Sequence, residues 1–158
     1  MNDHNILQLL VGEWSGSGQG EFPTIEPFEY LETLRFSTDN RPFVHYEQKT
    51  RRRNSPAADY RPSHWESGFI RLLPDGQVEL VNVQGGGRLE RLIGSLEQTE
   101  TGLILRLGSA AFLNDSRMIE TSRTFTLDGD SLHYTQDMGT TAVPSAAHHV
   151  EATLKRVA

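Results

Sequence analysis

Hydrophobic and polar residues alternate with a period of two along most of this chain. In the segment Glu29 to Ser37, for example, Tyr30, Leu34 and Phe36 fall on one side of an extended strand, because successive side chains of a strand point to opposite faces. Together with the turn signals, the pattern predicts about ten strands. They are one that begins at Gly12, then Glu29 to Ser37, Phe43 to Arg51, Ser63 to Leu73, Val78 to Val83, Arg88 to Leu96, Leu103 to Leu107, Met118 to Leu127, Ser131 to Met138 and His148 to Val157.

The connections between these segments are short. Pro74-Asp75-Gly76 and Asp128-Gly129-Asp130 are typical hairpin turns. Short turns favour an antiparallel meander, and a meander avoids open edges by closing into an up-and-down barrel. We therefore expect one all-β domain, residues 1–158, with about ten antiparallel strands in a barrel like those of lipocalins and fatty-acid-binding proteins. A barrel of this size tends to hold a ligand.

A helical pattern precedes the first strand. Asn2 or Asp3 can cap a short helix that carries Ile6, Leu9 and Leu10 on one apolar edge. We expect this helix to act as a lid or plug for the barrel.

Glycine recurs on one face of the first strand. Trp14, Gly16 and Gly18 are two residues apart, so the strand presents one large ring followed by bare backbone. Such a run marks either a barrel corner or a flat object lying against the backbone.

Composition and charge exclude several classes of function. The 158 residues carry a formal net charge of -6, which argues against a nucleic-acid surface, and the basic run Arg51 to Arg53 leads into a segment of turn formers. Without cysteine there is no disulfide, thiolate metal site or cysteine nucleophile. The start of the chain does not resemble a signal peptide, and no segment reaches membrane-spanning length. These features predict a cytoplasmic protein that binds neither nucleic acid nor membranes.

Several motifs, in order along nearly the whole chain, resemble the nitrobindin family, the haem-binding β-barrels related to the C-terminal domain of the THAP4 protein. The first is Gly12-x-Trp14-x-Gly16-x-Gly18, followed by Phe22-Pro23-Thr24-Ile25 and Pro27-Phe28-Glu29-Tyr30. The resemblance continues through Pro42-Phe43, Tyr46-Glu47-Gln48, His64 to Arg71, Val78-Glu79-Leu80, Asp128-Gly129-Asp130 and Met138 to Val157.

This resemblance implies a b-type haem whose iron is held by one histidine near the start of the last strand. It also implies binding of nitric oxide and, in the ferric state, isomerisation of peroxynitrite to nitrate. An iron with one protein ligand keeps a position open and can act as a Lewis acid toward a peroxynitrite oxygen. The scheme requires no distal acid or base, and the sequence offers no convincing one.

Two adjacent histidines compete for the role of iron ligand. Strand alternation places His148 on the same side as Val150, the expected inner face. The family pattern instead places the ligand immediately before a Leu or Val and the tail Ala-Thr-Leu-x-Arg, which matches His149 without a gap. We expect His149 to be the metal ligand and keep His148 as the alternative.

Other residues are expected near the haem. Thr24 matches a family threonine that contacts the haem, and its hydroxyl can donate to a propionate. Met138, like Met118, is a soft side chain suited to the wall around a flat cofactor. His45 and His133 are expected to be hydrogen-bonded strand histidines, and neither His4 nor His64 is assigned a role.

Two other classes of function compete with the haem protein. A barrel without haem could carry a fatty acid or another apolar small molecule, a view favoured by the small residues Val143 to Ala147 before the last strand and by Trp65 beside His64. A Ser-His-Asp hydrolase is a poor third, because the chain has no Gly-x-Ser-x-Gly motif. Exposed strands and an open haem edge could also pair two barrels in a homodimer.

Overall fold

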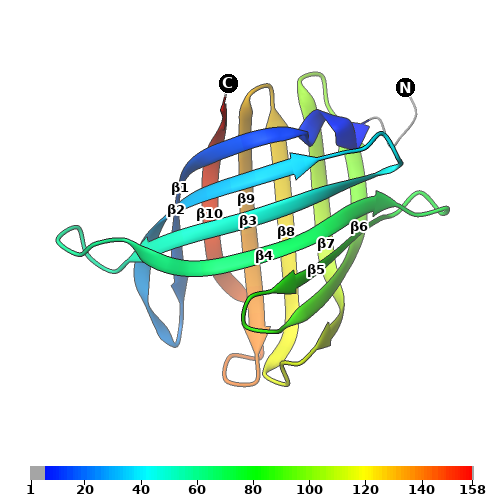
Figure 1. Ribbon diagram of the computed structural model, residues 1–158. Coiled ribbons are helices and arrows are strands. Elements are labelled where there is room, and N and C mark those ends of the chain that lie inside the picture. Colours follow the sequence, from blue (N-terminus) through cyan, green and yellow to red (C-terminus); the bar gives the residue numbers. More distant parts are fainter. Residues whose placement is uncertain (1–5, 158) are drawn as a thin grey trace.

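The alternating segments form a closed antiparallel barrel in the computed structural model, which describes residues 6–157 (Figure 1). Each strand pairs with its neighbours in the sequence, and β1 pairs with β10 to close the ring. The expected fold class is confirmed. The ten strands are β1 (Gly12–Phe22), β2 (Ile25–Ser37), β3 (Phe43–Arg53), β4 (Arg61–Leu72), β5 (Val78–Gln84), β6 (Leu89–Gln98), β7 (Gly102–Leu113), β8 (Met118–Asp128), β9 (Ser131–Thr140) and β10 (Ala147–Val157).

The expected hairpin turns are present. Gly76 and Gly129 have φ angles of 85° and 59° in the turns after β4 and β8, a backbone region that glycine enters without steric cost. Each hairpin therefore reverses the chain over a few residues and keeps consecutive strands side by side.

The N-terminal segment closes one end of the barrel. It ends in a 3-10 turn, η1 (Gln8–Leu10), and buries Leu7 and Leu10 in the core. Trp14 lies beneath them with 1% of its surface exposed, and its indole N–H donates to the Leu10 carbonyl oxygen at 3.0 Å. The segment is a plug, as expected, while its proposed caps Asn2 and Asp3 lie outside the described residues.

The interior changes character along the barrel axis. Next to the plug, inward-facing apolar side chains from all around the barrel pack into the core, among them Leu34, Val44, Ile70, Leu92, Leu105 and Leu132. Further along the same strands the inward positions become polar, with Glu32, Glu66, Asn82, Glu90 and Arg123 buried. At the far end the barrel holds a cavity.

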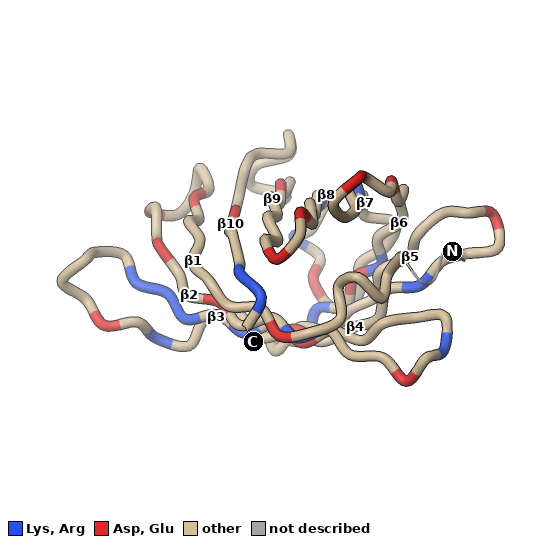
Figure 2. The backbone as a smooth tube through the Cα atoms, turned by 90° about the horizontal axis from the view of Figure 1, so that it is seen from above, with Lys and Arg blue, Asp and Glu red and all other residues tan. Residues whose placement is uncertain are grey.

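The outer surface carries charges of both signs. Figure 2 shows Lys and Arg mixed with Asp and Glu along the backbone, with a basic run at the end of β3. Among the described residues, no helix has both the length and the apolar character needed to cross a membrane. Large apolar side chains are exposed on β4 and β5, including Trp65 (54%), Phe69 (49%) and Val83 (50%).

Candidate functional site

The cavity has a volume of about 220 Å³ and lies at the barrel end opposite η1. Its walls come from the start of β2, the end of β3, the start of β4, the middle of β9 and the start of β10. Exposed Arg52 and Ser63 are among its lining residues, so it opens to solvent. Aromatic rings (Phe28, Tyr30, Tyr134) and polar side chains share the lining, the usual make-up of a small-molecule site.

A β-bulge at the start of β10 decides which histidine enters this cavity. The ladder between β9 and β10 pairs His148 with Asp137 and Val150 with Gln136, which leaves His149 as the extra residue. A bulge interrupts the inward and outward alternation of a strand. His149 and Val150 therefore both line the cavity, and His148 does not.

His149 is held in an orientation that suits a metal ligand. Its Nδ1 lies 3.2 Å from the Glu21 carbonyl oxygen, which can only accept, so Nδ1 donates and the lone pair is on Nε2. Phe22 and Phe28 pack edge-on against the ring, with centroids 5.7 and 6.4 Å away. Burial lowers the pKa of His149 below its ordinary value of 6.5, which favours the neutral imidazole that coordinates metals.

The other expected site residues lie at the same end of the barrel but outside the cavity lining. His148 is half-buried, and its Nδ1 is 3.7 Å from Asp137 Oδ1. Thr24 is exposed in the turn between β1 and β2. Met138 is half-buried on β9, paired with Ala147. Their contacts with a haem stay predictions.

The glycines of β1 make room for rings of the protein itself. A Cβ atom at Gly18 would lie 2.6 Å from the Tyr30 hydroxyl oxygen, and one at Gly20 would lie 2.1 Å from Cζ of Phe28. The flat objects on this backbone track are therefore the side chains of β2, which line the cavity wall beside His149.

The outer-face histidines behave as expected. His45 Nε2 is 2.8 Å from the Ser67 hydroxyl, and His133 Nδ1 is 2.9 Å from the Thr153 hydroxyl. Neither lines the cavity.

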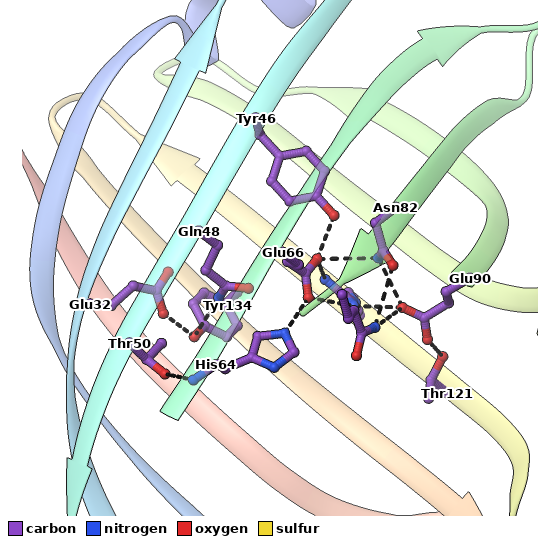
Figure 3. A network of polar contacts seen from close by, with 12 residues as sticks. Glu32, Tyr46, Gln48, Thr50, His64, Glu66, Asn82, Glu90, Thr121 and Tyr134 are labelled. Carbon is purple, nitrogen blue, oxygen red and sulfur yellow. Dashed lines mark hydrogen bonds and ion pairs between the residues drawn. The ribbon is translucent and has the colours of Figure 1, made fainter. Parts of the chain in front are cut away.

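A buried ionic network forms the floor of the cavity (Figure 3). The Arg123 guanidinium donates to Glu66 Oε2 at 2.8 Å and to Glu90 Oε1 at 2.6 Å. Burial alone would raise the pKa of Glu66, but Arg123 and His64 outweigh it and hold that pKa well below its usual range. Burial would raise the pKa of Glu90 too, but Arg123 and the hydrogen bonds from Thr121 and Asn82 together lower it. Tyr46, Asn82 and Thr121 donate further hydrogen bonds to the two carboxylates.

Another buried carboxyl group, Glu32, lies beside this network. It accepts a hydrogen bond from the Tyr134 hydroxyl, which is 2.7 Å from the Tyr30 hydroxyl. Its Oε2 is buried without a hydrogen-bond partner among the described residues. Burial raises the pKa of Glu32 to about 7, despite the opposing hydrogen bonds.

His64 lines the cavity as well, although no role was expected for it. It lies at the start of β4, and its Nε2 is 2.7 Å from Glu66 Oε1. The spacing His64-x-Glu66 was the available signal, because residues two apart on a strand share a face. This spacing indicates a site only when that face of the strand is known to line the inside of the barrel.

The cavity is chemically suited to a haem. It offers one neutral imidazole with a free Nε2, aromatic walls, and guanidinium groups near the opening. The Arg52 guanidinium carbon lies 5.0 Å above the Phe28 ring centre, and Arg88 has a buried Nε without a partner among the described residues. Because the cavity opens to solvent, the polar edge of a bound porphyrin could remain in water.

Comparison with known proteins agrees with this chemistry. The family model of the THAP4-like, haem-binding β-barrel domain matches residues 3–156. The chain belongs to this family. Family membership favours the haem-binding interpretation over a carrier that has lost the haem.

Similar proteins cover almost the same length. The chain is 38% identical over 157 residues to peroxynitrite isomerase 2 of Mycobacterium marinum, covering 98% of this chain and 94% of that protein. It is 39% identical over 142 residues to a peroxynitrite isomerase of Arabidopsis thaliana, covering 90% and 82% of the two chains. Its fold matches the crystal structure of Rv2717c from M. tuberculosis with a TM-score of 0.88 and 32% identity, covering 100% of this chain and 99% of that one.

Proposed function

We propose that the cavity binds a b-type haem whose iron is coordinated by Nε2 of His149. The main support is the hydrogen bond from Nδ1 of His149 to the Glu21 carbonyl oxygen, in a cavity bounded by Phe28 and Tyr30. In histidines that bind metals, a hydrogen bond from the ring nitrogen that does not bind the metal fixes the tautomer and the ring plane. Phe22 and Phe28 limit rotation of the ring further.

We further propose that the loaded protein converts peroxynitrite to nitrate and binds nitric oxide, as the names of its relatives suggest for the first activity. A ferric haem with one protein ligand supplies a Lewis acid with an open position. The residues of this chain would do the rest. Arg52, exposed at the opening, attracts an anion toward the cavity, and the rings of Phe28, Tyr30 and Tyr134 supply an apolar wall.

Three more residues enter the proposal. Thr24 lies in the turn between β1 and β2, at the cavity end of the barrel, where its hydroxyl could reach a propionate. Met138 and His148 lie near the start of β10 and could pack against the haem edge. Cytoplasmic localisation stays a prediction. So does a homodimer, for which the exposed Trp65, Phe69 and Val83 offer an apolar outer face.

The test is a hemin titration followed by visible absorption, with wild type, His149→Ala and His148→Ala as a matched pair. We expect a sharp Soret band in the wild type and in His148→Ala, and its loss in His149→Ala. Loss in His148→Ala alone would assign the iron to the other histidine. Binding no stronger than to an unrelated protein, and insensitive to both substitutions, would refute the haem proposal and leave the carrier interpretation.

A further inference from the structure

The cavity contains a second imidazole with a carboxylate behind it. His64 lines the cavity, and its Nε2 lies 2.7 Å from Oε1 of Glu66. The His64 side chain is 38% exposed, whereas that of Glu66 is 1% exposed. The pair therefore joins the cavity to the buried floor of the barrel.

Glu66 is fixed as an ionised acceptor. Arg123 donates to both of its oxygens, at 2.8 and 3.3 Å, and is held from the other side by Glu90 at 2.6 Å. Tyr46 and Asn82 donate to Oε2 as well. A carboxylate with so many donors around it only accepts, so the proton between Glu66 and His64 lies on Nε2 of the imidazole.

The consequence for His64 is a defined tautomer. With Nε2 protonated, the neutral ring presents the lone pair of Nδ1. The backbone N–H of His64 donates to the Thr50 hydroxyl at 3.0 Å, which fixes the start of β4 beside the cavity. The charged and titratable groups that share the lining are Tyr30, Arg52, Glu66, Arg88, Arg123, Tyr134 and His149.

We propose that His64 is the proton acceptor of the cavity, a catalytic base for ligands that arrive in protonated form, with Glu66 and Arg123 as its positioning residues. This inference rests on the proposed function for its substrate. It assigns a task to a residue that neither the sequence motifs nor the haem ligand explains.

The proton balance of the step is simple. Peroxynitrous acid gives its O–H proton to Nδ1 of His64, which leaves the peroxynitrite anion in the cavity and an imidazolium whose charge Glu66 compensates. No electron is transferred. Isomerisation of the peroxynitrite anion to nitrate neither consumes nor releases a proton. The imidazolium returns its proton to solvent when nitrate leaves. A carboxylate behind an imidazole stabilises the imidazolium in the same way in hydrolytic triads.

The tautomer can be tested without haem. In the 15N-labelled protein, two-bond 1H–15N correlations of His64 should show a protonated Nε2 and an unprotonated Nδ1. Glu66→Gln should abolish this preference, since an amide can donate as well as accept. A wild-type ring protonated at Nδ1 would overturn the proposal, whether or not the protein binds hemin.

The base can be tested with cyanide, which at neutral pH is mostly hydrogen cyanide and must lose its proton to bind ferric haem as the anion. In the hemin-loaded protein we expect His64→Gln to slow cyanide association about 100-fold, the low end of what a positioned base contributes. Glu66→Gln should slow it by about 10-fold, as when the partner of a functional histidine is lost. Nitric oxide, which carries no proton, should associate with all variants at similar rates.

His133→Gln is the matched control, because His133 lies on the outer face of the barrel, hydrogen-bonded to Thr153. It should leave both rates unchanged. If Glu66→Gln fails to fold, His64→Gln still tests the proposal, because the His64 side chain is partly exposed and its replacement disturbs the core less. Equal cyanide rates in the wild type and His64→Gln, with intact Soret bands, would overturn the role of His64 and leave the haem proposal standing. Absence of hemin binding by the wild type would refute the proposed function instead, and the tautomer measurement would still decide the pair.

Discussion

Two buried glutamates of the same barrel are expected to behave in opposite ways. Glu66 faces Arg123, and the cation keeps its pKa well below the ordinary range. Glu32 has only hydroxyl and amide groups within hydrogen-bond reach, so burial dominates and raises its pKa from 4.5 to about 7. Desolvation therefore acts on both residues, and the presence of a hydrogen-bonded cation decides the outcome.

Glu32 should make the barrel less stable as the pH rises. A carboxyl group with a raised pKa in the folded state contributes stability fully below its unfolded value, here 4.5, and that contribution is lost as the pH rises through about 7. Glu32→Gln keeps the shape without the charge. We expect the difference in the free energy of unfolding, Glu32→Gln minus wild type, to rise by roughly 3 kcal/mol from pH 4.5 to pH 8.

Urea denaturation at a series of pH values measures this difference. Glu97→Gln, on the exposed ion pair with Arg106, is the matched control and should give no such trend. A constant difference between Glu32→Gln and the wild type across the range would contradict the assignment.

The buried polar layer was the least predictable part of the interior. Glu32 shares a face with Leu34, and Glu66 shares one with Ile70, so the alternating pattern itself placed these carboxyl groups inside. Nothing in one strand reveals that Arg123, 57 residues away from Glu66 in the chain, arrives opposite it. Long-range pairing of this kind depends on the closed barrel, which the sequence predicted only as a class.

At the level of elements, the strands followed from the sequence and the bulge did not. All ten predicted segments are strands, and the turns after β4 and β8 lie where their turn residues indicated. Alternation, taken without interruption, pointed to His148 as the inward residue. The bulge between His148 and Val150 turns His149 into the cavity instead, in agreement with the family pattern. A bulge is a property of two paired strands, so one strand's pattern cannot show it.

The closing contact between β1 and β10 should tolerate no side chain at Gly16. A Cβ atom there would lie 2.3 Å from the Thr153 carbonyl oxygen and 2.9 Å from the Leu154 Cα. Both are backbone atoms that move only if the strands separate. We expect Gly16→Ala to lower the free energy of unfolding by about 2 kcal/mol, a typical cost of overpacking.

Gly108→Ala is the control, since it lies within β7 and a Cβ atom there meets nothing within 4 Å. Its stability should stay within about 0.5 kcal/mol of the wild type. Chemical denaturation of the two variants side by side gives the comparison, and equal stabilities would show that β1 and β10 can separate slightly at no cost.

The whole molecule is arranged as successive layers along one axis. A plug with an apolar core lies at one end, the ionic floor lies in the middle, and the cavity lies at the other end. Ten strands suggested a ligand-filled barrel, yet much of the interior is filled by the protein's own side chains. The residues that stabilise the fold and the residues that line the cavity therefore lie at different ends of the same strands.

This separation predicts how hemin should affect unfolding. Because the plug and the apolar core are packed by the protein's own side chains, the protein alone should unfold cooperatively. A ligand that binds only the folded state stabilises it by about 2.7 kcal/mol at a free concentration 100 times its Kd. For a domain of this size that corresponds to a rise in Tm of roughly 5 to 10 °C.

Calorimetry with increasing hemin should show Tm climbing with concentration in the wild type and staying fixed in His149→Ala. A wild-type protein that melts without cooperativity until hemin is added would show instead that the cavity end is needed to complete the fold.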